Sequence, residues 1–126
     1  MKHLFTQAIH FALLFVLAFG VGCNRSSAPP TPLTVEELPG AIEKAFSTAK
    51  PQAKELATQV VTCVQAKDYS KAFWGIQTIA GVPDLTKDQI KVTARATLTI
   101  NSLLQTAQAE GDAKATQTLQ QYRINK

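Results

Sequence analysis

Histidine and cysteine, the side chains behind most nucleophilic and zinc chemistry, are scarce in this chain. The two histidines, His3 and His10, both lie within the first 22 residues, and the two cysteines are Cys23 and Cys63. Beyond residue 22 the chain has no histidine, so neither Ser–His and Cys–His nucleophile pairs nor the usual zinc ligand sets can form there. We therefore expect a protein without a metal and without a cofactor.

Carboxylates are the remaining candidates for acid–base chemistry, and the nine Asp and Glu residues are scattered. The adjacent pair Glu36 and Glu37 sits where a helix N-terminus attracts negative charge. Asp84 and Asp88 have the one spacing that could bring two acids into a hydrolytic cleft, but this spacing is also typical of a helix start. We expect no catalytic residue and no enzyme.

The first 22 residues have the composition of an export signal. Lys2 supplies the positive start, and residues 11–22 form an apolar run without a charge. A membrane-spanning helix needs about 20 apolar residues, and extending this run backwards soon meets His10 and Gln7. The pattern favours a signal peptide over residues 1–22, with an uncleaved anchor as the less favoured alternative.

Cys23 follows Val21 and Gly22, and this order resembles the bacterial lipobox, in which the cysteine receives diacylglycerol. Gly20 stands where that pattern usually has leucine. The resemblance implies lipidation of Cys23 and anchoring to a membrane. The alternative is signal-peptidase cleavage after Gly20, which would leave Cys23 as a free thiol near the new N-terminus.

Residues 24–32 are polar and rich in proline, a composition that favours extended conformations and cannot bury a core. We therefore expect a flexible Ser/Pro-rich tether over residues 23–33 and one domain over residues 34–126. Lys2 and Arg25 precede that domain, which leaves eleven basic against nine acidic side chains. This balance does not indicate nucleic acid as a partner, because nucleic-acid binding requires a dense basic stripe.

The domain consists of Ala-, Gln-, Leu- and Lys-rich stretches, and we expect breaks between them at residues 39–40, 51, 67–68, 81–83 and 111–112. Thr34 with Glu37 and Thr86 with Gln89 have the spacing of helix capping boxes, and Pro51 suits the first turn of a helix. Asp68 and Asp112 are good N-caps. We predict an all-α bundle of about four to five helices.

One stretch has the period of a strand. From Val92 to Ile100 apolar residues occupy every even position, while Thr or Arg occupies every odd one. We predict a helix here, because a capping box starts it and apolar residues at helical spacing continue it. Strand remains the alternative. The helix would carry apolar residues around most of its circumference, as a central helix does, with Arg95 pointing outwards.

Within the domain, Cys63 has two interpretations. Its neighbours Val60, Val61 and Val64 favour a small buried side chain on a helix. The alternatives are a disulfide with Cys23, if Cys23 is not acylated in an oxidising compartment, or a disulfide between two chains.

Two junctions have similar sequences: residues 68–72 (Asp-Tyr-Ser-Lys-Ala) and residues 111–115 (Gly-Asp-Ala-Lys-Ala). In both, a branched residue and a glutamine follow four residues after Lys-Ala. These junction sequences resemble the turn of tetratricopeptide-type helical hairpins, although the two junctions are 43 residues apart and the repeat of that family is about 34 residues long. The chain as a whole resembles small alanine- and glutamine-rich helical lipoproteins of bacteria, a resemblance that implies no mechanism.

These features predict a non-catalytic lipoprotein of the bacterial cell envelope, periplasmic or at the cell surface, that contacts a protein or another envelope component. Trp74, beside Lys71 and about 100° from the buried stripe of its helix, is the candidate partner contact. The alternative is packing of Trp74 against the first or last helix. A second hypothesis is a secreted or periplasmic module that holds a small apolar or peptide ligand in a pocket lined by Leu98, Phe73 and Ile76.

Overall fold

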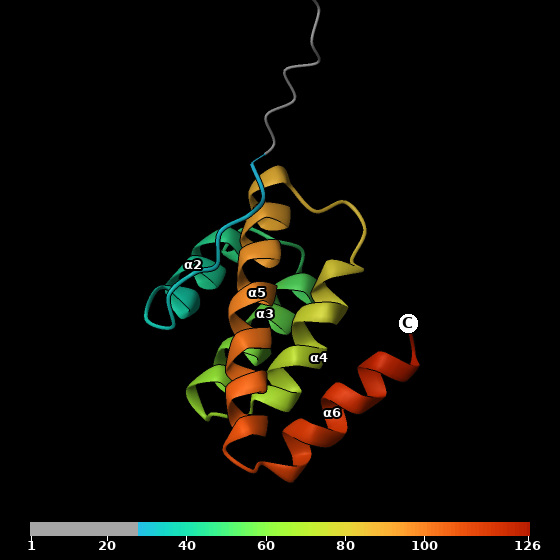
Figure 1. Ribbon diagram of the computed structural model, residues 1–126. Helices are drawn as coiled ribbons and strands as arrows, with labels where there is room; N and C mark the ends of the chain where they lie inside the picture. Colours follow the sequence, from blue (N-terminus) through green and yellow to red (C-terminus); the bar gives the residue numbers. More distant parts are fainter. Residues whose placement is uncertain (1–27) are drawn as a thin grey trace, which may run out of the picture.

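A computed structural model describes residues 28–126, and within this range the chain forms five α-helices and no strand. The prediction of an all-α bundle is therefore confirmed. In chain order the helices are α2 (Glu37–Phe46), α3 (Pro51–Gln65), α4 (Tyr69–Ala80), α5 (Lys87–Ala109) and α6 (Ala113–Ile124). α4 and α5 run in opposite directions side by side, and α6 runs obliquely from the end of α5 (Figure 1).

All five helices contribute to the core: α5 contacts α2, α4 and α6, and α3 packs on α2 and α4. Each helix turns one apolar stripe inwards, and burying that stripe is the main source of stability in a bundle. The largest side chains with less than 2% exposure come from all helices except α6. They are Leu38, Ile42, Phe46, Val60, Phe73, Ile76, Ile79, Ile100 and Leu104.

The expected local signals set most helix boundaries. Thr86 and Gln89 form a complete capping box at the start of α5, and Pro51 is the first residue of α3. The Asp68 carboxylate accepts a hydrogen bond from the backbone N–H of Lys71, and Gly81 ends α4. Helix boundaries in this chain are thus determined largely by side chains within four residues of them.

The break that we expected at Pro39 and Gly40 is absent, because both residues lie inside α2. Pro39 is the third residue of the helix, where its missing N–H removes no intrahelical hydrogen bond. The expected bonds between Thr34 and Glu37 form in both directions, at 3.1 and 3.2 Å. The first turn of the helix therefore accommodates the proline.

The alternating stretch from Val92 to Ile100 is helical, as predicted. The buried residues of this stretch are not simply its apolar ones: Thr93 and Thr99 are buried, whereas Leu98 is 41% exposed. We expected Arg95 to point outwards. Arg95 is half-buried, and its Nε donates a hydrogen bond to the backbone oxygen of Thr31 at 2.9 Å.

The segment that precedes α2 lies against α5. The Thr99 hydroxyl donates a hydrogen bond to the backbone oxygen of Leu33 at 2.7 Å, and the Leu33 side chain is 6% exposed among core residues. Leu33, which we assigned to the tether over residues 23–33, therefore packs with the bundle. Thr31, which also precedes the expected domain start at residue 34, accepts a hydrogen bond from α5 as well.

The α3–α4 and α5–α6 hairpins have the same turn. In each, one residue with positive φ precedes the N-cap aspartate: Lys67 at 57° and Gly111 at 92°. The backbone N–H groups of Asp68 and Asp112 both bond to the carbonyl five residues earlier, the pattern of a Schellman motif. Buried positions also recur at a spacing of 43 residues, as in the pairs Ala53/Ala96, Val61/Leu104, Ala72/Ala115 and Ile76/Leu119.

Candidate functional site

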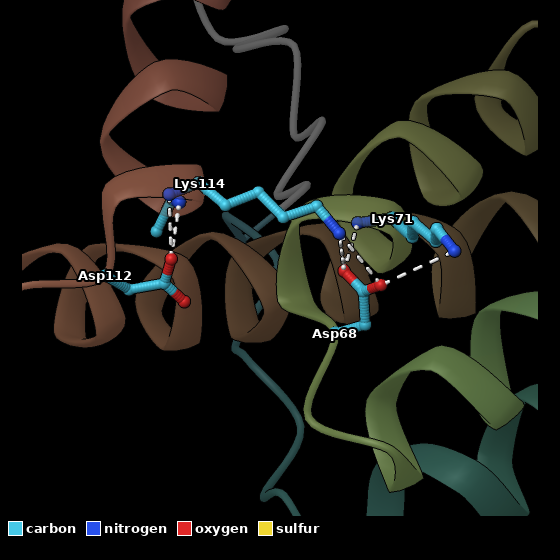
Figure 2. A network of polar contacts seen from close by, with 5 residues as sticks. Asp68, Lys71, Asp112 and Lys114 are labelled. Atoms are coloured by element: carbon cyan, nitrogen blue, oxygen red, sulfur yellow. Dashed lines mark hydrogen bonds and ion pairs between the residues drawn. The ribbon is translucent and has the colours of Figure 1, made fainter.

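The two similar junctions meet in space and form a network of charges (Figure 2). Lys114 Nζ lies 3.0 Å from both carboxylate oxygens of Asp68, and Lys71 Nζ lies 3.7 Å from one of them. Asp112 accepts hydrogen bonds from the backbone of Lys114 and Ala115. Both carboxylates are thus engaged in helix capping or in linking the hairpins, which indicates a structural role for the network.

The pKa of the Asp68 carboxyl group is lowered in the folded protein. Burial raises its pKa, but the backbone N–H of Lys71 and the hydrogen bond and charge of Lys114 outweigh burial, so that the pKa lies below its ordinary value of 3.8. A lowered pKa in the folded state means that ionised Asp68 stabilises the fold. This contribution is present above the unfolded-state pKa and is lost as the pH falls through the folded-state pKa.

Asp68→Asn is therefore expected to lower the melting temperature at pH 7 and to have progressively less effect in acid. The amide keeps a capping oxygen, so the loss at neutral pH reflects the missing charge and amounts to about 0.5–1 kcal/mol for these partly exposed pairs. Thermal unfolding of both proteins at pH 7 and in strong acid measures the effect. The matched control is Asp112→Asn, at a cap without a lysine ion pair within residues 28–126. A deficit equal at the two pH values would contradict the expectation.

The two expected partner-contact residues lie one turn apart on α4. Trp74 is 38% exposed, and its ring meets the buried Phe73 edge-on with centroids 5.4 Å apart. Phe73 in turn meets Tyr122 of α6 edge-on, at 5.1 Å. The Lys71 side chain is 71% exposed. Trp74 is thus in contact with the core on one side and partly open to solvent on the other, and its role as a partner contact remains a prediction.

The three side chains expected to line a ligand pocket do not share one. Phe73 and Ile76 are 1% and 0% exposed, closed within the core. Leu98 points to another face, where it lines a hollow of about 500 Å³ together with Val35 and Leu103. This hollow lies between α5 and the segment that leads into α2, so the apolar surface belongs to a different part of the fold than we predicted.

The candidate carboxylates at the start of α5 are exposed. Asp84 forms an ion pair with Lys50 at 3.5 Å, and Asp88 lies in the first turn of α5. Cys63 is a free, half-buried thiol packed against the core. Among residues 28–126, no three His, Cys, Asp or Glu side chains are grouped so that they could hold a metal ion. Cys23 and the predicted signal peptide over residues 1–22 lie outside the described residues.

Sequence reasoning missed the residues that hold the chain before α2 against the bundle. Thr99 was interpreted as a polar position of an alternating stretch and Arg95 as an outward-pointing side chain, but the acceptors of both lie more than 60 residues away in the sequence. The residues around a threonine or arginine in a helix do not indicate such a distant hydrogen-bond acceptor. One feature of the sequence could have indicated this contact, namely the apolar Leu33 at the end of a polar segment.

A scan of protein-family models and searches of curated proteins and of solved structures find no match to this chain. None of the helices in residues 28–126 combines the length and the hydropathy that crossing a bilayer requires.

Proposed function

We propose that this protein is a non-catalytic lipoprotein of the bacterial cell envelope, anchored to a membrane through Cys23, whose helical domain contacts a protein or another envelope component. The leader over residues 1–22 and the position of Cys23 after Val21 and Gly22 support the anchor. The Asp68 and Asp112 carboxylates, which cap helices, suit a domain without chemistry of its own.

One observation carries the proposal furthest: the chain is fixed to α5 only eight residues after Cys23. Thr31 and Leu33 are each held there by a hydrogen bond from an α5 side chain, and the Leu33 side chain is buried. A lipid on Cys23 would therefore hold the bundle close to the membrane, with a limited range of orientations. Such a link suits a domain that must be presented to a partner.

Trp74 and Lys71 are the proposed contact with that partner. A tryptophan that is supported on one face by Phe73 loses little conformational entropy on binding, and a neighbouring lysine adds a charge for orientation. The surface of α4 near the Asp68 end would then bind a partner that offers an apolar cleft with an acidic rim.

Cys23→Ser tests the anchor. We expect the wild-type protein to sediment with membranes, with an acylated Cys23 at its mature N-terminus by mass spectrometry, and the variant to lose membrane association almost completely. Cys63→Ser is the matched control, since it removes the other cysteine and should leave the protein on the membrane. A mature wild-type protein that starts at Val21 with a free thiol at Cys23 would contradict the proposal.

The second candidate is a secreted or periplasmic module for a small apolar ligand, and the hollow beside Leu98 favours it. Its exposed apolar members include Val35 at 43% and Leu98 at 41%. Cleavage after Gly20, combined with saturable binding of an apolar fluorescent probe that Leu98→Lys abolishes, would support this function over the first.

A further inference from the structure

Three cationic side chains line a hollow of about 570 Å³ between α2 and the first half of α5. They are Lys44, Lys91 and Arg95, and the single carboxylate in the lining is Asp88. None of the three cations forms an ion pair with another residue in the range 28–126, where the ion pairs involve Lys50, Lys71 and Lys114. With three cations and one carboxylate, the lining of the hollow has a net positive formal charge.

The chain before α2 passes this hollow. Arg95, which lines it, is the residue that holds the backbone of Thr31 at 2.9 Å. Cys23 lies eight residues before Thr31, and eight residues span at most about 28 Å when fully extended. A lipid anchor on Cys23 thus limits how far the hollow can move from the membrane surface.

The path of the described chain also indicates which end of the bundle a lipid on Cys23 would bring nearer to the membrane. The chain that leads to Cys23 leaves beside the N-terminal end of α5, whereas the α3–α4 and α5–α6 turns lie at the opposite end (Figure 1). The 23 residues of α5 separate these ends by about 34 Å, several times the screening length of about 8 Å at physiological salt. The N-terminal end of α5 can therefore approach the membrane more closely than the opposite end, and only groups within about one screening length of the surface interact appreciably with its charge.

We infer that the hollow lined by Lys44, Lys91 and Arg95 binds the headgroups of anionic phospholipids in the membrane that carries the lipid anchor; the inference rests on the proposed function. Ammonium and guanidinium groups pair with phosphate oxygens, and Arg95 can do so only in part because its Nε is already used. Threonine hydroxyls and alanine methyl groups make up much of the remaining lining, which contains no aromatic ring on which a nucleic-acid base could stack.

The test follows the reactivity of lysines in the full, acylated protein reconstituted into vesicles. One vesicle preparation is neutral phosphatidylcholine, and the other contains about 30% phosphatidylglycerol, enough to give a negative surface potential. A neutral amine-acylating reagent and mass spectrometry give the labelling rate at each lysine. We expect the rates at Lys44 and Lys91 to fall about five-fold in the anionic vesicles and the rate at Lys67, in the α3–α4 turn, to stay unchanged.

A pair of matched variants separates this site from general attraction. Lys87, at the start of α5 but outside the hollow lining, serves as the reporter. In the wild-type protein, anionic vesicles should protect Lys87 from labelling. This protection should be lost in the Lys44→Gln/Lys91→Gln variant. The Lys67→Gln/Lys71→Gln variant, which lacks two lysines at the opposite end, should retain it.

Equal rates at Lys44 and Lys91 in both vesicle types, with the protein still on the vesicles, would overturn the inference and leave the anchor intact. Protection by inorganic phosphate in neutral vesicles, equal to that by phosphatidylglycerol, would also overturn it, because the site would then bind the free anion. Failure of the protein to stay with either vesicle type would instead contradict the proposed function.

Discussion

Phe73→Ala is expected to lower the free energy of unfolding by about 3–5 kcal/mol, the range for deleting a buried aromatic ring. Phe73 is 1% exposed and meets Trp74 and Tyr122 edge-on, so its ring links α4 to α6. α6 buries few other side chains, namely Ala115, Thr118 and Leu119. Loss of the Phe73 ring should therefore weaken the docking of α6 in particular. Urea unfolding followed by circular dichroism measures the change.

Trp74→Ala is the matched control, because it removes a larger ring from the next position of the same helix. With 38% of its surface exposed, Trp74 should contribute less, about 2 kcal/mol. Because Trp74 is the only tryptophan, the tryptophan fluorescence of the wild-type protein comes from this ring alone, and a soluble quencher should reduce it. A loss as large as that of Phe73→Ala would show that Trp74 is a core residue and would remove it as a candidate partner contact.

The sequence alone predicts the helices well, because their ends are marked by local chemistry. The N-caps Asp68, Thr86 and Asp112 each bond to a backbone N–H within three residues, and such a pair is visible in the sequence before any fold is known. The alternating stretch after Val92 is helical because the capping box at Thr86 and the burial of α5 outweigh a weak preference for strand.

Local sequence patterns do not predict contacts between distant parts of the chain. Thr99 is buried and Leu98 exposed because the segment before α2 packs over one face of α5, and no local pattern reports that contact. The hollow that contains Lys44 and Arg95 likewise joins residues about 50 positions apart. Lys71 and Trp74 could be placed together, since one helical turn separates them, but the contact of Phe73 with Tyr122 depends on the docking of α6.

The close approach of α3 and α4 has a specific requirement that leads to the second large effect. Gly75 lies in the middle of α4, and a β-carbon built there would stand 2.8 Å from Cγ2 of Val60 on α3. That distance is well below van der Waals contact. Val60 is 1% exposed and β-branched, so its methyl group cannot rotate away without entering an unfavourable rotamer.

Gly75→Ala is therefore expected to destabilise the fold by about 1–3 kcal/mol, as overpacking does, even though alanine is the better helix former by about 1 kcal/mol. Gly40→Ala is the matched control. Gly40 also lies within a helix, α2, but a β-carbon there meets nothing within 4 Å, so the variant should be more stable by about 0.5–1 kcal/mol. Urea unfolding of the two variants should thus give opposite signs for the same chemical change.

Val60→Ala makes the test specific to this contact. Alone it should lower stability by leaving a cavity, but in the Gly75→Ala background the smaller side chain makes room for the new methyl group, so it should have much less effect. A double-mutant cycle by urea unfolding gives this coupling energy. Additive effects of the two substitutions would mean that α3 and α4 relax apart at Gly75, and that their close approach is not what keeps a glycine at this position.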